Sequence, residues 1–416
     1  MPEKNIIKFP KGFYFGASTS SHQVEGDNDN NWTEWELKNA DKLARRAQKN
    51  IKQWNEVALD AQKQENYFSG KACDHFNLFE EDIYLLKKLG LNSYRFSLEW
   101  SRIEPEKGKF DKEAIDHYRK MIRVLRTYNI EPFVTLWHWT EPKWFAKSGG
   151  FANPKSVKYF ARFARKVVYS FGDDVEFIIT QNEPEIFTMN SYFRGIWPPQ
   201  RKNIFTSLRV FSNLIRAHKA AYDDIKKINP HIRVGIAKNN TYFEAYKNKF
   251  LNKILKRITD KVWNEYYLNK ISDYQDFIGL NYYFHNRING WFNQNENRAV
   301  SDLGWELYPK GIFYTLCELK KYKKPIYITE NGLADIGDKF RAQYIEKILK
   351  SVNLAIRDGV DVRGYMHWSL MDNFEWAEGF WPRFGLVEID YETQERIPRE
   401  SAYKYSDLIK KYSDVS

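Results

Sequence analysis

Cysteines and long apolar runs are scarce in this chain. Its 416 residues include two cysteines, Cys73 and Cys317, too few for a disulfide framework. We therefore expect a reduced, cytoplasmic protein in which both are buried free thiols. There is no apolar run of about 18 residues, and residues 1–5 lead into no apolar signal core. We expect neither a membrane partner nor a secretory leader.

The chain also lacks a compact basic arm, although its net charge is +11 and its pI is near 9.2. Lysines and arginines are spread along helical stretches such as 42–52, 155–166 and 247–261. We interpret these as solvated helix faces and expect no nucleic-acid partner. Aromatic residues, by contrast, are abundant: 14 Trp and 27 Tyr exceed what a core needs, and their flat faces suit sugar rings.

A glycine-rich phosphate-binding turn is missing as well, since no Gly-x-Gly-x-x-Gly follows the first predicted strand. This absence disfavours an open doubly wound sheet. Short apolar segments predict eight strands, at 13–17, 93–97, 131–137, 177–181, 233–237, 277–281, 326–329 and 363–368. Helical periodicity lies between them, at 74–89, 111–128, 155–170, 206–228, 339–357 and 401–412. This alternation predicts the α/β class and a (β/α)8 TIM barrel.

No linker or repeat divides the chain, so we predict a single catalytic domain over residues 1–416. Residues 36–70 form a charged insertion with helical propensity after the first strand. Because strand-to-helix loops lie at the catalytic face of a TIM barrel, we expect this insertion on the catalytic rim.

Two glutamates directly follow apolar strands. Glu183 stands in the segment 180–184 (TQNEP), and Glu330 stands in 328–332 (ITENG). Either one alone would be interpreted as a helix cap or a turn residue. In a barrel both would point into one cavity, although 330 − 183 = 147 positions separate them. Paired carboxyl groups of this kind divide the roles of acid and nucleophile in glycoside cleavage.

Other polar and aromatic residues gather at the same strand ends. The two glutamates need unequal pKa values for this reaction. Arg95 and a tyrosine hydroxyl would keep one glutamate ionised, while burial and negative charge would raise the pKa of the other. Taken alone, Arg95 favours a structural ion pair and His138 a core histidine. The other residues at these ends are Gln23, Trp139, Asn182, Asn281, Tyr283, Trp368, Glu375 and Trp376.

Five segments together resemble the motifs of glycoside hydrolase family 1, the β-glycosidases. They are 13–26 (FYFGASTSSHQVEG), 94–103 (YRFSLEWSRI), 182–184 (NEP), 329–332 (TENG), and 367–376 (HWSLMDNFEW) continuing to 383–386 (RFGL). The resemblance runs from about Phe9 to Tyr405, which is nearly the whole chain.

This resemblance implies roles for individual residues. Glu183 would be the general acid/base and Glu330 the nucleophile of a retaining double displacement. The nucleophile would be supported by Arg95, Asn281 and Tyr283. The implied substrate-binding residues are Gln23, His138, Trp139, Asn182, Trp305, Trp368, Glu375, Trp376 and Phe384. The implied reaction is hydrolysis of terminal β-D-glucosides, with galactosides and fucosides also expected, and without a metal or a cofactor.

Single residues separate the chain from special members of that family. Plant thioglucosidases carry glutamine at the acid/base position, so Glu183 indicates ordinary O-glycosides. The 6-phospho-β-glycosidases replace the pair Glu375 and Trp376, and a carboxylate there would repel a 6-phosphate. The chain also departs from the family pattern at Ile178 and Asp27. Its segment 184–281 is shorter than expected, which predicts an open aglycone entrance.

Two other classes stay open at this point, a non-catalytic sugar-binding barrel and a metal-dependent barrel enzyme. The intact carboxyl pair disfavours the first, and the lack of a His-x-His strand end disfavours the second. Carboxyl groups roughly 5 Å apart would accompany retention, and a separation near about 9 Å would accompany inversion. The sequence leaves open the preferred sugar, the natural aglycone, the balance of hydrolysis and transglycosylation, and the oligomeric state.

Overall fold

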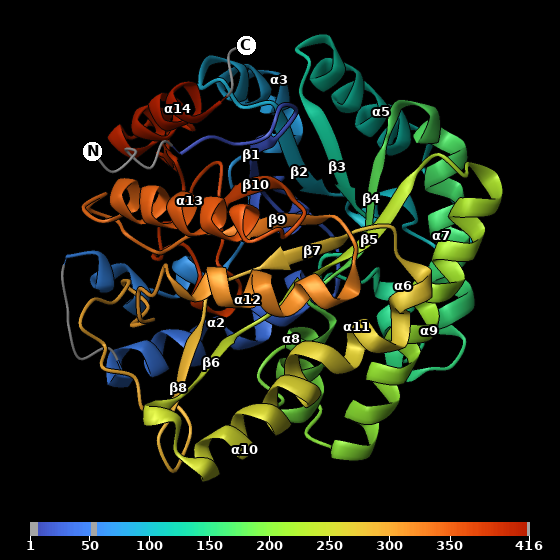
Figure 1. Ribbon diagram of the computed structural model, residues 1–416. Coiled ribbons are helices and arrows are strands. Elements are labelled where there is room, and N and C mark those ends of the chain that lie inside the picture. Colours follow the sequence, from blue (N-terminus) through green and yellow to red (C-terminus); the bar gives the residue numbers. More distant parts are fainter. Residues whose placement is uncertain (1–6, 51–55, 414–416) are drawn as a thin grey trace.

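Eight parallel strands form a closed barrel, and helices surround it (Figure 1). The computed structural model describes residues 7–50 and 56–413. The strands follow one another around the barrel in the order β1-β10-β9-β7-β5-β4-β3-β2. The first and last predicted strands are therefore neighbours, and the predicted (β/α)8 fold is confirmed. The barrel strands are β1 (Tyr14–Ser18), β2 (Ser93–Ser97), β3 (Glu131–Thr135), β4 (Phe177–Asn182), β5 (Arg233–Asn239), β7 (Ile278–Asn281), β9 (Ile326–Asn331) and β10 (Val362–Trp368).

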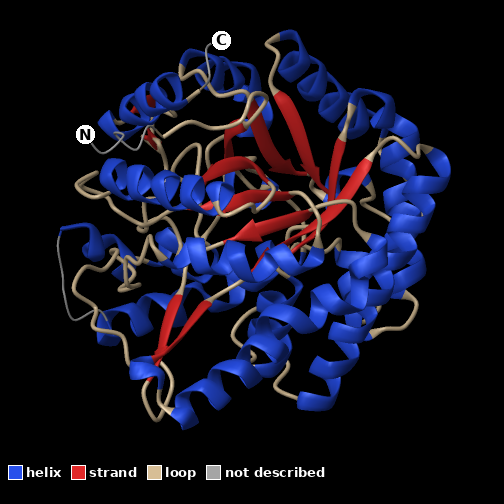
Figure 2. Ribbon diagram, viewed as in Figure 1, coloured by secondary structure: helices blue, strands red, loops and turns tan. Residues whose placement is uncertain are grey.

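Long helices pack outside these strands where apolar periodicity predicts them (Figure 2). The helix α5 (Lys112–Thr127) shows the local cause. The side chain of Asp111 accepts a hydrogen bond from the Ala114 amide at 2.9 Å and caps the first turn. Its buried face includes Ile115, Tyr118 and Ile122. The other helices on predicted segments are α3 (His75–Lys88), α7 (Ser156–Phe171), α9 (Ile204–Ile228), α13 (Arg341–Arg357) and α14 (Glu400–Tyr412), and the shorter α12 (Gly311–Leu319) lies on a segment for which no helix is predicted.

The amino-terminal end of the barrel is filled with aromatic rings. Phe133 and Phe177, on adjacent strands, stack with ring centroids 4.1 Å apart. Tyr327 packs against both, and Phe277 and Tyr14 complete the cluster. These side chains close the barrel interior at this end, so the space for a pocket lies at the opposite end.

The chain between the first two strands forms the predicted helical insertion. It begins with α2 (Asn31–Asn50), ahead of the expected boundary at Glu36. Residues 51–55 lie outside the described residues, and two short helices follow, η1 (Glu56–Gln62) and η2 (Gln64–Tyr67). Leu43 and Arg46 of α2 line the pocket at the carboxyl end of the barrel.

A second group of elements lies outside the barrel after β5. The strands β6 (Tyr242–Ala245) and β8 (His285–Ile288) pair with each other. Between them in sequence come α10 (Phe250–Thr259), the π-helical turn η7 (Asp260–Glu265) and α11 (Tyr266–Ile271). Shorter elements complete the fold: α1 (Ser21–Val24), α4 (Trp100–Ile103), α6 (Lys143–Lys147), α8 (Pro184–Thr188), η5 (Met189–Phe193), β11 (Val387–Ile389) and β12 (Arg396–Pro398).

Within the described residues no helix combines the length and the apolar character needed to cross a bilayer. Both cysteines are free thiols. Cys73 is buried, as predicted, but the prediction of burial is wrong for Cys317. It is partly exposed, because it lies toward the outer side of α12, where its thiol faces the carboxylate of Asp358.

Candidate active site

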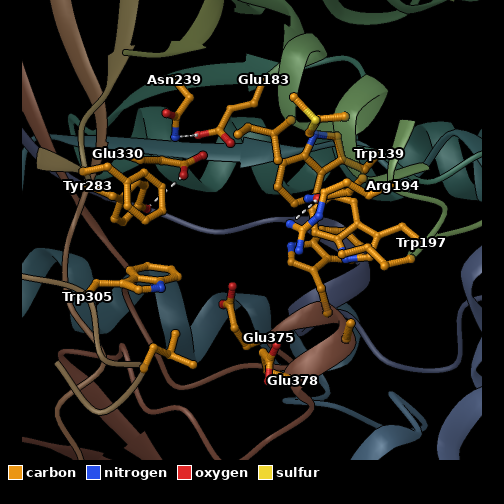
Figure 3. Close-up of a pocket in the computed structure, with 18 of the residues that line it drawn as sticks. Trp139, Glu183, Arg194, Trp197, Asn239, Tyr283, Trp305, Glu330, Glu375 and Glu378 are labelled. Carbon is orange, nitrogen blue, oxygen red and sulfur yellow. Dashed lines mark hydrogen bonds between the residues drawn. The ribbon is translucent and has the colours of Figure 1, made fainter. Parts of the chain in front are cut away.

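One pocket opens where the carboxyl ends of the strands meet (Figure 3). Both Glu183, which follows β4, and Glu330, on β9, line it, and Figure 3 shows their side chains directed into the same hollow. Eight further predicted residues line the same pocket: His138, Trp139, Tyr283, Trp305, Trp368, Glu375, Trp376 and Phe384.

The backbone at Glu183 departs from regular strand geometry. The pairing of β4 with β5 shifts register after Ile179, and Glu183 has a φ of 41°, in the left-handed region. Its amide donates a 2.8 Å hydrogen bond to the carbonyl of Ala237, which holds this turn. Pro184 then begins α8, so the side chain of Glu183 leaves the strand end toward the pocket.

Neutral donors surround the carboxyl group of Glu183. Its Oε1 accepts hydrogen bonds from Asn281 Nδ2 at 2.8 Å and from Asn239 Nδ2 at 3.1 Å. Burial, together with the nearby charges of Glu330 and Glu185, raises the pKa of Glu183 to about 8. A carboxyl group with this pKa holds its proton at neutral pH and can act as an acid.

A cation, in contrast, faces Glu330. The guanidinium of Arg95 donates a hydrogen bond to Oε1, and the hydroxyl of Tyr283 donates to Oε2 at 3.0 Å. Burial raises the pKa of Glu330, but the charge of Arg95 and both hydrogen bonds oppose that rise. These contacts favour the carboxylate form, the form that attacks an electrophilic carbon.

Arg95 and Asn281 join the two halves of the site. Both donate to Asn182 Oδ1, Arg95 through Nη2 at 2.7 Å and Asn281 through Nδ2 at 3.1 Å. Because this oxygen accepts both bonds, the Nδ2 of Asn182 must be the donor to His138 Nε2, at 2.9 Å. The proton of the neutral imidazole then sits on Nδ1.

His138 therefore carries an unused donor at the pocket. Its Nδ1 is buried without a hydrogen-bond partner among the described residues. Burial, assisted by the charge of Arg95, holds the pKa of His138 well below its ordinary value. The unpaired N–H distinguishes His138 from a core histidine with both ring nitrogens bonded, and its role in binding the sugar stays a prediction.

Glu375 lies across the pocket from the two glutamates, below them in Figure 3. Burial raises its pKa to about 8, and the charges of Glu330 and Glu378 add to the effect. Gln23 donates to Glu375 Oε2 at 3.3 Å, but its Nε2 also contacts Asn373 Oδ1 and the carbonyl of Phe374, each at 2.8 Å.

Four predicted residues stand behind the pocket wall. Gln23, Arg95, Asn182 and Asn281 are buried and are not among the described residues that line the pocket. Each bonds to a residue that does line it, namely Glu375, Glu330, His138 and Glu183 in that order. In this structure they orient lining residues.

Aromatic rings form the walls. Trp139 is fixed by a 2.9 Å hydrogen bond from Nε1 to the carbonyl of Asn182, and its ring packs against Trp376. Opposite them, Trp305 contacts Tyr283 and Phe384. These flat faces leave a slot between them at the pocket entrance (Figure 3).

Sequence reasoning missed several lining residues. Asn239 bonds to Glu183 and lies on β5, two positions past the predicted strand end at Ala237. A longer strand would have placed it at the catalytic face. The other missed lining residues come from the segments that follow the strands: Leu43, Arg46, Ile186, Met189, Asn190, Arg194, Ile196, Trp197, Trp263, Phe284, Leu303, Ala377 and Glu378.

Two buried carboxyl groups in one pocket at the carboxyl end of a (β/α)8 barrel are the arrangement that glycoside hydrolysis requires. Comparison with known proteins gives the family. The family model for glycosyl hydrolase family 1 matches residues 5–268 and 245–413, and the chain belongs to this family. The predicted enzyme class, an O-glycosyl hydrolase of the β-glucosidase type, is confirmed.

Individual relatives agree with that membership. The chain is 34% identical to β-glucosidase A of Thermotoga maritima over 457 aligned positions, which cover 98% of each protein. A β-galactosidase of Pyrococcus woesei is 30% identical, with 95% of each covered. Among solved structures, a β-glycosidase from Pyrococcus horikoshii has a TM-score of 0.85 and 38% identity, with 97% of this chain and 95% of that chain covered.

Proposed function

We propose that this enzyme is a retaining β-glycosidase that hydrolyses terminal, non-reducing β-D-glucosides through a covalent glycosyl-enzyme. The observation that carries the proposal is the unequal pair of carboxyl groups in one pocket. Glu330 accepts a hydrogen bond from Arg95, whereas Glu183 accepts from the neutral amides of Asn281 and Asn239. Such a difference assigns the acid to Glu183 and the nucleophile to Glu330.

In the first step the proton of Glu183 passes to the glycosidic oxygen as the bond from that oxygen to the anomeric carbon breaks. The carboxylate of Glu330 forms the new bond to this carbon, and the aglycone leaves as a neutral alcohol. Tyr283 would hold Glu330 in position for this attack, because its hydroxyl donates a hydrogen bond to the second carboxylate oxygen.

In the second step Glu183 acts as a general base instead of a general acid. Now ionised, it takes a proton from water while the water oxygen attacks the anomeric carbon. The bond to Glu330 breaks, and its carboxylate again faces Arg95. Two inversions at one carbon give net retention, and the proton taken from water restores the acid form of Glu183.

Sugar recognition would rest on His138 and Glu375, which both line the pocket and carry polar groups for the ring hydroxyls. Trp368 and Trp376 would provide apolar faces for the ring. We include β-galactosides and β-fucosides as further substrates. Support comes from the relatives: one is a β-galactosidase, and the Thermotoga maritima β-glucosidase has been solved with both glucoimidazole and a galacto-hydroximolactam.

Two finer expectations belong to the same proposal. The 457 aligned positions exceed the 416 residues of this chain, so at least 457 − 416 = 41 of them hold no residue of it. The short segment 184–281 is the ground on which we propose an open aglycone entrance. The cytoplasmic location is supported by the two free thiols, Cys73 and Cys317.

Proton NMR of the first turnover tests the mechanism directly. With an aryl β-glucoside the β-anomer of glucose should appear first and mutarotate later. Early α-anomer would mean inversion and would overturn the proposal. A panel of aryl glycosides that share one leaving group and differ in the sugar then ranks glucose, galactose and fucose.

A further inference from the structure

A group of large apolar side chains on the outside of the molecule has no part in the active site. Its centre is the continuous helical stretch from α10 through η7 to α11, at the bottom of Figure 1. The apolar patch consists of ten residues, each 40–80% exposed: Ile204, Phe205, Leu208, Phe250, Leu251, Ile254, Ile258, Val262, Tyr266 and Trp291.

The helical part of the patch is a single face. Phe250, Ile254, Ile258, Val262 and Tyr266 are spaced four residues apart. In a pure α-helix this spacing drifts by about 40° per step, but the wider π-helical turn at 260–265 drifts the other way. The stripe therefore stays on one side of the stretch from end to end.

The opposite side of the same stretch is held by polar contacts. Asn252 is buried and donates to the carbonyl of Tyr246 at 3.0 Å, and buried Asn264 donates to the carbonyl of Thr241 at 2.9 Å. Amides thus face the protein while isoleucine and phenylalanine face outward. A surface helix usually turns its apolar side chains toward the protein and its polar side chains toward solvent, and here the positions are exchanged. The exposed apolar face is therefore a candidate contact surface.

Neighbouring elements extend the patch. Phe211 of α9 packs against Tyr266, with ring centroids 6.0 Å apart, and this contact sets Leu208 and Phe205 beside α11. At the other end, the Gly290 amide donates to Asn252 Oδ1 at 2.9 Å, which brings Trp291 next to the start of α10. The ten side chains come from three segments and form one area.

Positive charge predominates in two of the segments that carry the patch. Residues 247–262 contain six lysines or arginines and one acidic residue, and residues 201–216 contain four and none. The one acid, Asp260, pairs with Lys256. Within the described ranges no ion pair includes Lys249, Lys253, Arg257 or Lys261. Four unpaired cations beside an apolar face indicate a partner that has both negative charge and an apolar layer into which side chains can insert.

We propose that the apolar patch docks on an anionic lipid surface. Its side chains would enter the boundary between headgroups and acyl chains, and the flanking cations would contact lipid phosphates and carboxylates. A second copy of the chain is a poorer occupant, because a two-fold contact through this face would set its cations against one another. The proposal replaces our interpretation of 247–261 as a solvated helix face.

The patch also borders the active site. Trp263, which follows Val262 in the chain, lines the pocket. An enzyme docked through this face would hold its pocket entrance near the lipid headgroups, and sugars attached to membrane-bound aglycones would then be within reach.

Co-sedimentation of the full-length enzyme with vesicles tests the proposal. The wild type should bind vesicles that contain phosphatidylserine, bind phosphatidylcholine vesicles less, and dissociate as salt is added. The variant Phe250→Ser, Ile254→Ser, Ile258→Ser should lose at least about tenfold in partition coefficient. Reversal of Lys253, Arg257 and Lys261 to glutamate should cost at least as much on the anionic vesicles.

Matched controls carry equal changes elsewhere. Tyr169→Ser, Leu354→Ser, Tyr403→Ser removes three exposed apolar groups from α7, α13 and α14, and Lys155→Glu, Lys158→Glu, Lys347→Glu reverses three exposed charges. Both controls should bind as the wild type does, and all variants should hydrolyse a soluble aryl glucoside normally. Equal vesicle binding by the patch variants overturns the proposal. A wild type that does not bind vesicles also overturns it. This includes a wild type that forms an oligomer through the patch, so that the patch variants are monomeric.

Discussion

The two ends of the barrel use the same eight strands but bury opposite kinds of side chains. At the amino-terminal end Phe133, Phe177 and Tyr327 pack ring against ring. At the carboxyl end Glu183 and Glu330 are buried with Arg95, so charge is held away from water. Apolar packing lowers the free energy of folding, whereas buried charges raise it unless they are paired. The comparison separates the part that stabilises the barrel from the part that reacts.

The largest effect is expected from Glu330→Gln. The amide cannot form the glycosyl-enzyme, so kcat on an aryl β-glucoside should fall by more than about 10⁴-fold. Because Arg95 loses its charged partner, thermal unfolding should occur at a lower temperature, but the variant should still be folded at the assay temperature. Activity near that of the wild type in the folded variant would break the comparison.

Phe177→Ala should lower stability and leave activity largely unchanged. It opens a cavity among Phe133, Phe277 and Tyr327, and we expect a loss of about 3–5 kcal/mol in the free energy of unfolding. Urea denaturation measures the loss, and kcat per folded molecule should change little. Phe177→Leu is the milder control. A collapse of kcat in fully folded Phe177→Ala protein would contradict the separation of the two ends.

Tyr283→Phe removes one hydrogen bond to the nucleophile. A bond to a charged group contributes about 1.5–3 kcal/mol, so kcat/KM should fall about tenfold or more. The pKa of Glu330 should also rise, because the lost donor favoured its carboxylate, and the acidic limb of the pH profile should move to higher pH. Tyr282→Phe is the control: its hydroxyl donates to the carbonyl of Tyr308, away from the glutamates, and should affect stability alone.

The smallest effect concerns pH. Glu183 must be protonated in the first step and has a pKa of about 8, so activity is present below that value and lost above it. We expect kcat/KM to fall about tenfold per pH unit on the alkaline side. Glu183→Gln, assayed on a glucoside with an acidic phenol, should lose this limb. Glu375→Gln should keep it, although the pKa of Glu375 is also about 8.

The strands and their end residues were predictable because parallel strands buried on both faces leave continuous apolar segments. All eight appear at the expected places, and Glu183 and Glu330 meet although they are far apart in sequence. Asn239 escaped prediction because β5 continues with Lys238, a polar residue that normally marks a strand end. Lys238 is buried here because it pairs with Glu185 at 2.9 Å.

Residues outside the strands were harder to place. Trp197 and Trp263 reach the pocket from loops and helices whose path depends on tertiary packing. The sugar-binding role of Gln23 stays a prediction, and in the structure its amide is bonded to Asn373, Phe374 and Glu375 behind the wall. No local pattern distinguishes a residue that lines a pocket from one that supports it. The single-domain division of residues 1–416 and the roughly 5 Å carboxyl separation stay predictions.

The central claim is that the cation beside Glu330 makes it the nucleophile, while neutral amides leave Glu183 as the acid. Mass spectrometry after incubation with an activated 2-deoxy-2-fluoro-β-glucoside tests this most directly, since fluorine slows release of the glycosyl-enzyme. We predict one fluorosugar on the peptide that contains Glu330, and none on that peptide in Glu330→Gln. A label on the Glu183 peptide, or turnover with no label anywhere, would contradict the account.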